Sequence, residues 1–108
     1  MTAVFNTEIK VVYTTVHTAA QAEELALQAV VLRYVACVNI HPHVMSIYAW
    51  NNTIEKSEEV SLLFKVSKKK LNDFLKWLDL YHPYDVPAVL IYDAGTTKDY
   101  ASFLETLP

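Results

Sequence analysis

The sequence predicts a single α+β domain built on one antiparallel sheet, and three observations support this fold class. Segments rich in β-branched residues alternate with two segments of helical periodicity. A long central stretch of alternating apolar and polar residues contains an Asn-Asn pair, which is typical of an antiparallel hairpin. No linker or shift in composition divides the chain, so residues 1–108 are expected to form one domain.

The first two elements are predicted to be a strand and a helix. Residues 8–16 consist largely of β-branched residues, which favour a strand. Thr18 and Gln21 have the spacing of a capping box, so a helix is expected to begin there and to continue to about Arg33. Glu23 and Glu24 fall in its first turns, where the helix dipole favours acidic side chains.

A long hairpin is predicted at the centre of the chain. Residues 35–40 form a short strand, Pro42 interrupts the ladder by removing a donor, and residues 44–50 resume it. Asn51-Asn52 is expected to make the turn, because asparagine tolerates positive φ, and residues 54–66 return. The tip of this hairpin is too polar to lie in its own core, so we expect the arm to reach a neighbouring subunit.

The last third of the chain predicts a helix, a strand and a final helix. Ser67 is expected to cap a helix that ends before Pro83. A strand over residues 86–92 follows, and Pro87 within it favours an edge position or a strand start. Residues 98–107 are expected to be helical. The order β-α-β-β-α-β-α is that of a ferredoxin-like split βαβ sandwich with an added C-terminal helix, and the helices are expected on one face of the sheet.

Composition narrows the class of protein. The formal net charge of −3 gives no electrostatic reason to expect a nucleic-acid partner. One cysteine, Cys37, cannot form an intrachain disulfide, which fits a reducing compartment, and a cytoplasmic location is expected. No signal peptide is apparent, and residues 25–38, the longest apolar stretch, are too short to cross a bilayer, so no membrane partner is expected. The single glycine, Gly95, excludes glycine-rich phosphate loops.

Three blocks of the chain resemble the CutA family. The central hairpin is similar through residues 36–42, 46–50 and 58–60, the second signature through His82-Pro83-Tyr84-x-x-Pro87, and the C-terminal helix through residues 99–104. The resemblance implies a ferredoxin-like domain assembled as a tight homotrimer, whose hairpin arms pair between subunits. It also implies an association with tolerance to divalent cations, most often copper. Trimers of this kind resemble PII signalling proteins, which bind small ligands between subunits.

The chain departs from the family pattern at positions that bear on metal binding. Many bacterial members carry a cysteine where this chain has Thr14, a second histidine where it has Tyr81, and a glutamate where it has Ala88. His41 and His43 replace the isoleucine and glycine that are usual in the hairpin. The resemblance alone therefore does not carry a copper site over to this chain.

Two groups of histidines are candidate metal ligands. His82, presented with Tyr84 by a loop that two prolines stiffen, has the imidazole that copper and zinc favour. The alternative is that His82 caps the preceding helix and Tyr84 packs beside it. His41 and His43 would point to the same side of an extended segment and could chelate one ion, which a trimer would complete around its threefold axis. Their alternative is two solvated histidines beside a bulge.

Trp50, Glu59 and Lys65 lie on or near the hairpin. On the resemblance, they are expected to line a ligand cleft between subunits together with His82 and Tyr84. The alternative is that they are polar surface residues with a packing tryptophan at the trimer seam.

No catalytic activity is expected, because no serine–histidine–aspartate or cysteine–histidine pairing has a recognisable signature and the only arginine, Arg33, lies late in a helix. The sequence thus indicates a non-catalytic homotrimer associated with divalent-ion tolerance. It is expected to need no cofactor, with copper or zinc as the candidate ion. Two alternatives stay open: a PII-like sensor of a small ligand, and a scaffold for a partner protein.

Overall fold

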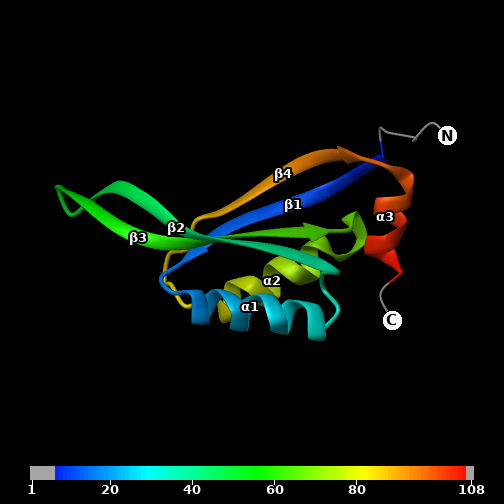
Figure 1. Cartoon of the computed structure of the whole chain (residues 1–108), viewed down its shortest axis with the longest axis horizontal. Coiled ribbons are helices and arrows are strands. Elements are labelled where there is room, and N and C mark those ends of the chain that lie inside the picture. The colour runs from blue at the N-terminus through cyan, green and yellow to red at the C-terminus, as the bar shows by residue number, and fades with distance from the viewer. Residues whose placement is uncertain (1–6, 107–108) are drawn as a thin grey trace.

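The computed structural model describes residues 7–106, which form a four-stranded antiparallel sheet and three α-helices (Figure 1). The strands are β1 (Thr7–Val16), β2 (Cys37–Trp50), β3 (Thr53–Val66) and β4 (Val89–Thr96). The helices are α1 (Ala19–Val31), α2 (Leu71–Tyr81), which follows the 3-10 turn η1 (Lys68–Lys70), and α3 (Lys98–Glu105). The strand order β2-β3-β1-β4 confirms the ferredoxin-like fold and places β4 at an edge, the position that Pro87 favoured.

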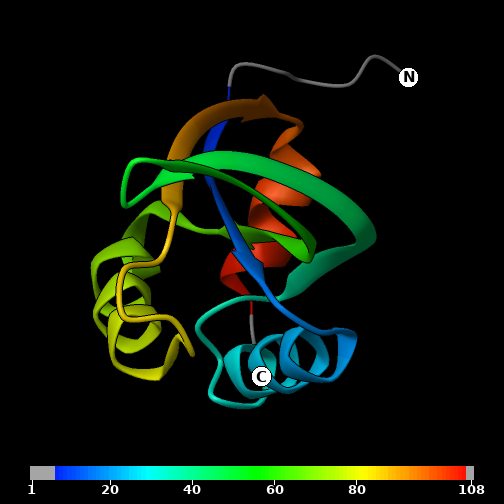
Figure 2. The same ribbon diagram turned by 90° about the vertical axis from the view of Figure 1, so that its left-hand side faces the viewer.

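α1 and α2 cover one face of the sheet, and the main core lies between them and the strands (Figure 2). The buried face of α1 contains three alanines, which let this helix lie close to the sheet, whereas α2 contributes large aromatic side chains. The fully buried side chains include Val12, Val16, Leu62, Phe64, Phe74 and Leu78. Within the described residues, no helix is long and apolar enough to span a membrane.

α3 packs on the opposite face of the sheet, which corrects the prediction that all helices share one face. Ile9 lies three residues before Val12, an odd spacing that directs the two side chains to opposite faces. Ala101 and Leu104 of α3 bury Ile9 in a small second core. This face carries apolar side chains of its own, so a short amphipathic helix gains burial there. The predicted helix end at Leu107 lies outside the described residues.

β2 is one continuous strand, and the interruption predicted at Pro42 is a bulge. The pairing of β2 with β3 shifts register between His41 and Val44, and His43 adopts a positive φ of 61°. Beyond the bulge, β2 and β3 leave the body as an arm (Figure 1). Asn51 and Asn52 close it with φ of 50° and 63°, which confirms the predicted turn.

Two predicted boundaries and one predicted cap differ from the structure. α1 ends at Val31 rather than at Arg33, because Arg33 adopts a left-handed φ of 67°. The side chain of Ser67 makes no capping hydrogen bond, since the chain enters a 3-10 turn there. β4 begins at Val89 rather than at residue 86, because the loop with Pro87 has no donor to offer the ladder at that position.

The start of α1 agrees with its prediction. The Gln21 N–H donates to the Thr18 hydroxyl oxygen at 3.1 Å, and the Gln21 side chain accepts from the Thr18 N–H at 3.3 Å, so the capping box is complete. Glu23 and Glu24 lie beyond the first turn, because the helix begins at Ala19.

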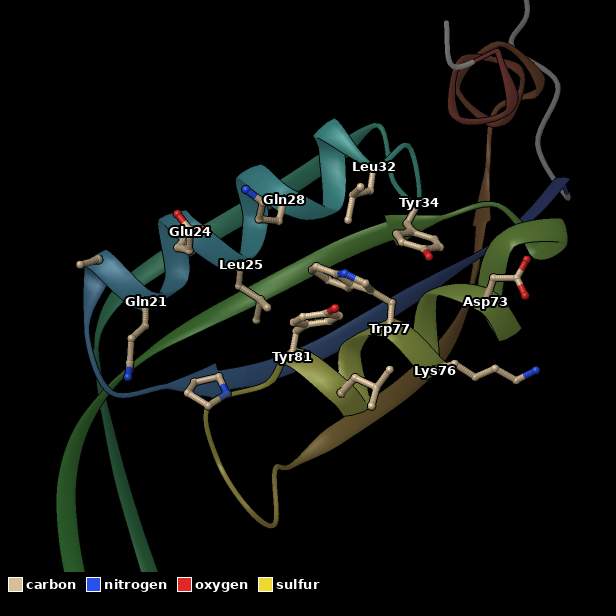
Figure 3. A pocket seen from close by; sticks show the side chains of 13 residues that line it. Gln21, Glu24, Leu25, Gln28, Leu32, Tyr34, Asp73, Lys76, Trp77 and Tyr81 are labelled. Carbon is tan, nitrogen blue, oxygen red and sulfur yellow. The ribbon is translucent and has the colours of Figure 1, made fainter.

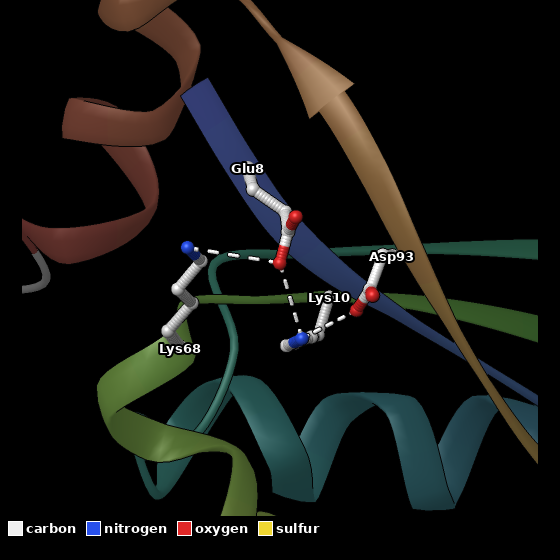
Figure 4. A network of polar contacts seen from close by, with 4 residues as sticks. All are labelled: Glu8, Lys10, Lys68 and Asp93. Carbon is white, nitrogen blue, oxygen red and sulfur yellow. Dashed lines mark hydrogen bonds and ion pairs between the residues drawn. The ribbon is translucent and has the colours of Figure 1, made fainter. Parts of the chain in front are cut away.

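A network of ion pairs connects the start of β1 with β4 and η1 (Figure 4). Lys10 donates to its cross-strand partner Asp93 and, at 3.2 Å, to Glu8, while Lys68 lies 3.6 Å from Glu8. Hydrogen bonds to Asp93 and Glu8 raise the pKa of Lys10. These contacts join β1 to β4 and to η1.

Candidate functional site

Three of the predicted cleft residues meet at the base of the arm. Glu59 comes from β3, His82 follows the last residue of α2, and Tyr84 lies in the loop before β4. The Tyr84 hydroxyl donates to Glu59 Oε2 at 2.6 Å, and the Tyr84 and His82 rings lie 5.0 Å apart. Glu59 and His82 are 8% and 7% exposed, so a carboxylate and an imidazole are both buried here.

His82 is held at both ring nitrogens. Its Nδ1 accepts from the Tyr84 N–H at 3.0 Å, so Nε2 carries the proton and donates to the Thr14 hydroxyl at 2.9 Å. That hydroxyl in turn donates to the Ala88 carbonyl oxygen at 2.7 Å. Burial lowers the pKa of His82, although the Thr15 backbone and the Glu59 carboxylate oppose this shift. The imidazole is therefore neutral near pH 7.

These contacts do not fit a metal ion at His82. A metal ligand needs a free nitrogen lone pair, and here Nδ1 accepts a hydrogen bond while Nε2 carries a proton. The ring contacts Thr14, whose hydroxyl is in turn bonded to the Ala88 carbonyl oxygen, and neither residue offers a thiolate or a carboxylate. The contacts agree better with the alternative that His82 caps the preceding helix. The His82 backbone N–H donates to the Leu78 carbonyl oxygen at 2.8 Å, at the end of α2. Metal binding by His82 stays a prediction that this geometry disfavours.

Glu59 is a buried carboxylate surrounded by hydroxyl groups. Burial would raise its pKa, but the nearby hydroxyls of Ser46 and Thr15, the hydrogen bond from Tyr84 and the nearby His17 outweigh burial and lower the pKa below its ordinary 4.5. Among residues 7–106, neither lysine nor arginine forms an ion pair with Glu59. The site therefore holds a fixed negative charge whose partners are mainly neutral donors.

Tyr84 connects the members of this site. Its ring packs between those of His17, at 4.5 Å, and His82, at 5.0 Å. Burial and the hydrogen bond to Glu59 raise its pKa, so the phenol keeps its proton near neutral pH and stays a donor. We name Glu59, Tyr84, Ser46, Thr15 and His17 the Glu59 cluster. Such a cluster can attract a cationic group and exchange hydrogen bonds with hydroxyl groups.

Trp50 and Lys65 do not join this cluster within one chain. Each lies six residues along a strand from the cross-strand pair Glu59 and Val44, which corresponds to about 20 Å in opposite directions. Trp50 is 57% exposed next to the turn of the arm, and Lys65 Nζ lies 3.8 Å from Cys37 Sγ. Their place in a cleft between subunits stays a prediction.

His41 and His43 lie at the exposed bulge. The positive φ of His43 breaks the extended geometry from which chelation by this pair was predicted. His43 Nδ1 instead lies 2.7 Å from Glu58 Oε1. Residues 7–106 contain no group of three or more histidine, cysteine, aspartate or glutamate side chains able to hold a metal ion. A site completed by other subunits is untested.

Sequence reasoning missed several members of the cluster, namely Thr15, His17 and Ser46. Ser46 could have been found by counting the hairpin register from the Asn51-Asn52 turn, which pairs residue 44 with Glu59 and leaves residue 46 two positions away on the same face. Thr15 and His17 carry no such signal, because the pairing of β1 with β3 is not local.

Comparisons with known proteins agree on one family. A family profile described as "CutA1 divalent ion tolerance protein" matches residues 10–106. The divalent-cation tolerance protein CutA of Yersinia pestis is 35% identical over 86 residues, which are 79% of this chain and 72% of that protein. CutA from Synechococcus elongatus superposes with a TM-score of 0.91 at 29% identity, covering 97% of this chain and 94% of the other.

Two further structures bear on ligands. The same Synechococcus protein complexed with a Bis-Tris molecule has a TM-score of 0.87 at 29% identity and covers 99% of this chain and 100% of the other. The PII-like protein CutA from Nostoc, in apo form, has a TM-score of 0.81 at 28% identity and covers 88% and 92%. The profile match and the sequence identity show that this chain belongs to the CutA1 divalent ion tolerance family.

Proposed function

We propose that this chain serves divalent-ion tolerance as a non-catalytic, cytoplasmic homotrimer that binds a small cationic ligand at the Glu59 cluster, in a cleft between subunits. The observation that carries the proposal is the buried Glu59 carboxylate, which is 8% exposed and has no lysine or arginine partner in the described part of the chain. The family is named for ion tolerance rather than for a reaction, which supports a non-catalytic role.

Exposed apolar surface supports self-association. One face of the arm carries Met45, Ile47 and Ile54, which are 57%, 66% and 82% exposed. α3 covers only part of the sheet face on which it packs. Leu90 and Tyr92 lie on the rest of that face and are 47% and 51% exposed. The radius of gyration is 15.2 Å, whereas a compact chain of this length has about 13 Å, so the arm offers surface that a single chain does not bury.

The chemistry of the Glu59 cluster supports an amine with hydroxyl groups as the ligand class. An ammonium group would pair with the carboxylate, and ligand hydroxyls would exchange hydrogen bonds with Ser46, Thr15 and Tyr84. Bis-Tris, which the Synechococcus protein holds in one structure, is a tertiary amine that carries several hydroxyl groups. It is therefore a reasonable first probe.

Calorimetric titration of Bis-Tris into the purified protein tests the ligand proposal, and native mass spectrometry of the same sample tests the trimer. We expect Glu59→Gln to weaken binding at least about tenfold, a loss of about 1.4 kcal/mol. Glu58→Gln is the matched control, because Glu58 adjoins Glu59 on β3, faces the other way and is exposed. Equal affinities for the two variants would overturn the ligand site.

A divalent ion is the second candidate ligand, and the description of the family, divalent ion tolerance, supports it. Three copies of His41 and His43 in a homotrimer would supply enough imidazoles for a copper or zinc site. Titration of Cu²⁺ and Zn²⁺, followed by native mass spectrometry, tests this. Loss of the bound ion in the paired His41→Ala and His43→Ala variant, with retention in His82→Gln, is the expected result. Uptake that requires His82 would contradict it.

A further inference from the structure

A polar cavity of about 340 Å³ lies where β1, η1 and α3 meet. It differs from the larger groove of about 1030 Å³ between α1 and α2, whose floor is a row of aromatic rings that includes Trp77 (Figure 3). Five of the seven side chains that line the polar cavity are charged or carry a hydroxyl group. None of them belongs to the Glu59 cluster, so the proposed ligand site leaves this cavity unexplained.

Ser67 supplies an unpaired hydroxyl group to the polar cavity. The residue is only 5% exposed, yet its side chain neither caps η1 nor forms a hydrogen bond with another described residue. No side-chain oxygen in the described residues is both unpaired and sealed from solvent, so the Ser67 hydroxyl opens onto the cavity. It can donate a hydrogen bond to a group placed there.

The start of β1 adds free backbone groups on the same side. Pairing of β1 with β3 begins at Lys10, whereas its pairing with β4 begins at Thr7. Residues 7–9 line the cavity and make no backbone hydrogen bond to η1. Because successive residues of an antiparallel strand direct their N–H and C=O groups to opposite sides, at least one of the three offers both groups on the side where β3 has ended.

The two sides of the cavity carry opposite charges. Lys68 follows Ser67 at the start of η1, whereas Glu105 lies in the last turn of α3 and forms no ion pair with the described residues. Carbonyl oxygens concentrate negative charge at the end of a helix, and this turn contains no basic residue. Glu8, 3.6 Å from Lys68, completes the charged lining, and Figure 4 shows both residues beside α3.

The charge within and next to the cavity sums to zero. The lining alone contributes 1 − 2 = −1. Lys70 is directed elsewhere, because its ammonium group donates to the Arg33 carbonyl oxygen at 2.7 Å. The other adjacent charges are two basic and one acidic, which brings the total to 3 − 3 = 0: Lys10, Lys69 and Asp93. A ligand that carries one positive and one negative group therefore matches the cavity better than a simple cation or anion does.

We propose that this polar cavity binds a small free α-amino acid. The ammonium group of the ligand pairs with Glu105 at the end of α3, and its carboxylate accepts hydrogen bonds from the Ser67 hydroxyl and the Lys68 ammonium group. Ile9 and Ala101, which pack together, offer apolar contacts to a short side chain. The volume lies at the lower end of the range for ligand pockets, which suits a ligand of this size. This inference goes beyond the proposed function and does not depend on it.

Valine is the probe, and the NMR signal of the Ala101 methyl group, which lines the cavity, is the readout. We expect a saturable shift that is half complete at or below about 1 mM valine. Valinamide lacks the carboxylate and isovalerate lacks the ammonium group. Each should bind at least about tenfold more weakly than valine, because each leaves one side of the cavity without its partner.

Matched variants locate the ligand. Lys68→Gln and Glu105→Gln should each weaken valine binding about fivefold. Their controls are Lys69→Gln, on the adjacent residue of η1, and Asp99→Asn, on the same helix as Glu105, because neither residue lines the cavity. Ser67→Ala should also weaken binding about fivefold, since it removes one hydrogen bond to the carboxylate. Native circular dichroism of every variant establishes that the fold is kept.

Four results would overturn the proposal. The first is the absence of a saturable shift up to about 10 mM valine. The second and third are equal affinity for valine and valinamide, which would show a site for cations alone, and equal affinity for valine and isovalerate, which would show a site for anions alone. The fourth is an equal effect of the lining variants and their controls.

Discussion

At the scale of single residues, Thr14 holds the loop before β4 to the body of the sheet. Its hydroxyl accepts from His82 Nε2 and donates to the Ala88 carbonyl, and it is fully buried. Thr14→Val keeps the shape but leaves both partners unsatisfied, so we expect the free energy of unfolding to fall by about 2 kcal/mol in urea denaturation. Thr14→Ser keeps the hydroxyl and should lose only about 0.8 kcal/mol for the missing methyl group. Equal losses would show that these hydrogen bonds contribute little.

His82 also gives stability a defined pH dependence. Its folded pKa lies below the ordinary 6.5, so in acid the unfolded chain takes up a proton that the folded chain does not. The unfolded state then binds more protons, and stability falls as the pH drops through the ordinary histidine pKa of 6.5. Glu59 faces this ring, but its lowered pKa stabilises the fold throughout this window, and that stabilisation is lost only at pH values below about 4.5.

Urea denaturation across this pH range tests the assignment. We expect His82→Gln to show a flatter dependence of the unfolding free energy on pH than the natural chain, because glutamine does not titrate. Thr14→Ser is the control, since it keeps the imidazole buried. An unchanged slope in His82→Gln would mean that another group titrates on unfolding.

At the scale of elements, one of two predicted helix caps forms its side-chain hydrogen bond and the other does not. The Thr18 hydroxyl accepts from the Gln21 N–H, whereas the Ser67 side chain makes no capping bond. Thr18→Ala should therefore lower the free energy of unfolding by about 1 kcal/mol. Ser67→Ala should change it by less than about 0.5 kcal/mol. Thermal denaturation of the two variants compares the caps, and a larger loss for Ser67→Ala would contradict the assignment.

Elements governed by local chemistry were predictable, and those governed by distant packing were not. Asn51 and Asn52 alone predict the turn, because their positive φ is a property of asparagine. The face on which α3 packs depends on Ile9, about ninety residues earlier in the chain, so local pattern could not assign it. In the site, His82 and Tyr84 were indicated by the loop that Pro83 and Pro87 stiffen, and Glu59 by family resemblance. Thr15 was missed, because only the register of β1 with β3 brings it near Glu59.

At the scale of the whole molecule, the arm makes the chain elongated and carries apolar side chains that a single copy leaves exposed. The principal extents are 52 × 27 × 22 Å, and the arm lies at one end of the long axis (Figure 1). The arm residues Ile47 and Ile54 share one face and are largely exposed. Burying each isoleucine side chain in an interface would contribute about 2 kcal/mol, and the proposed homotrimer would repeat that gain in each subunit.

The paired Ile47→Ser and Ile54→Ser variant is expected to abolish the trimer in native mass spectrometry while its circular dichroism stays native. Lys56→Ser is the control, because Lys56 is the cross-strand partner of Ile47 on the same face. A natural chain that is monomeric at micromolar concentration, or a paired variant that stays trimeric, would contradict this arrangement. Bis-Tris binding should also be lost in this variant, because the proposed cleft lies between subunits.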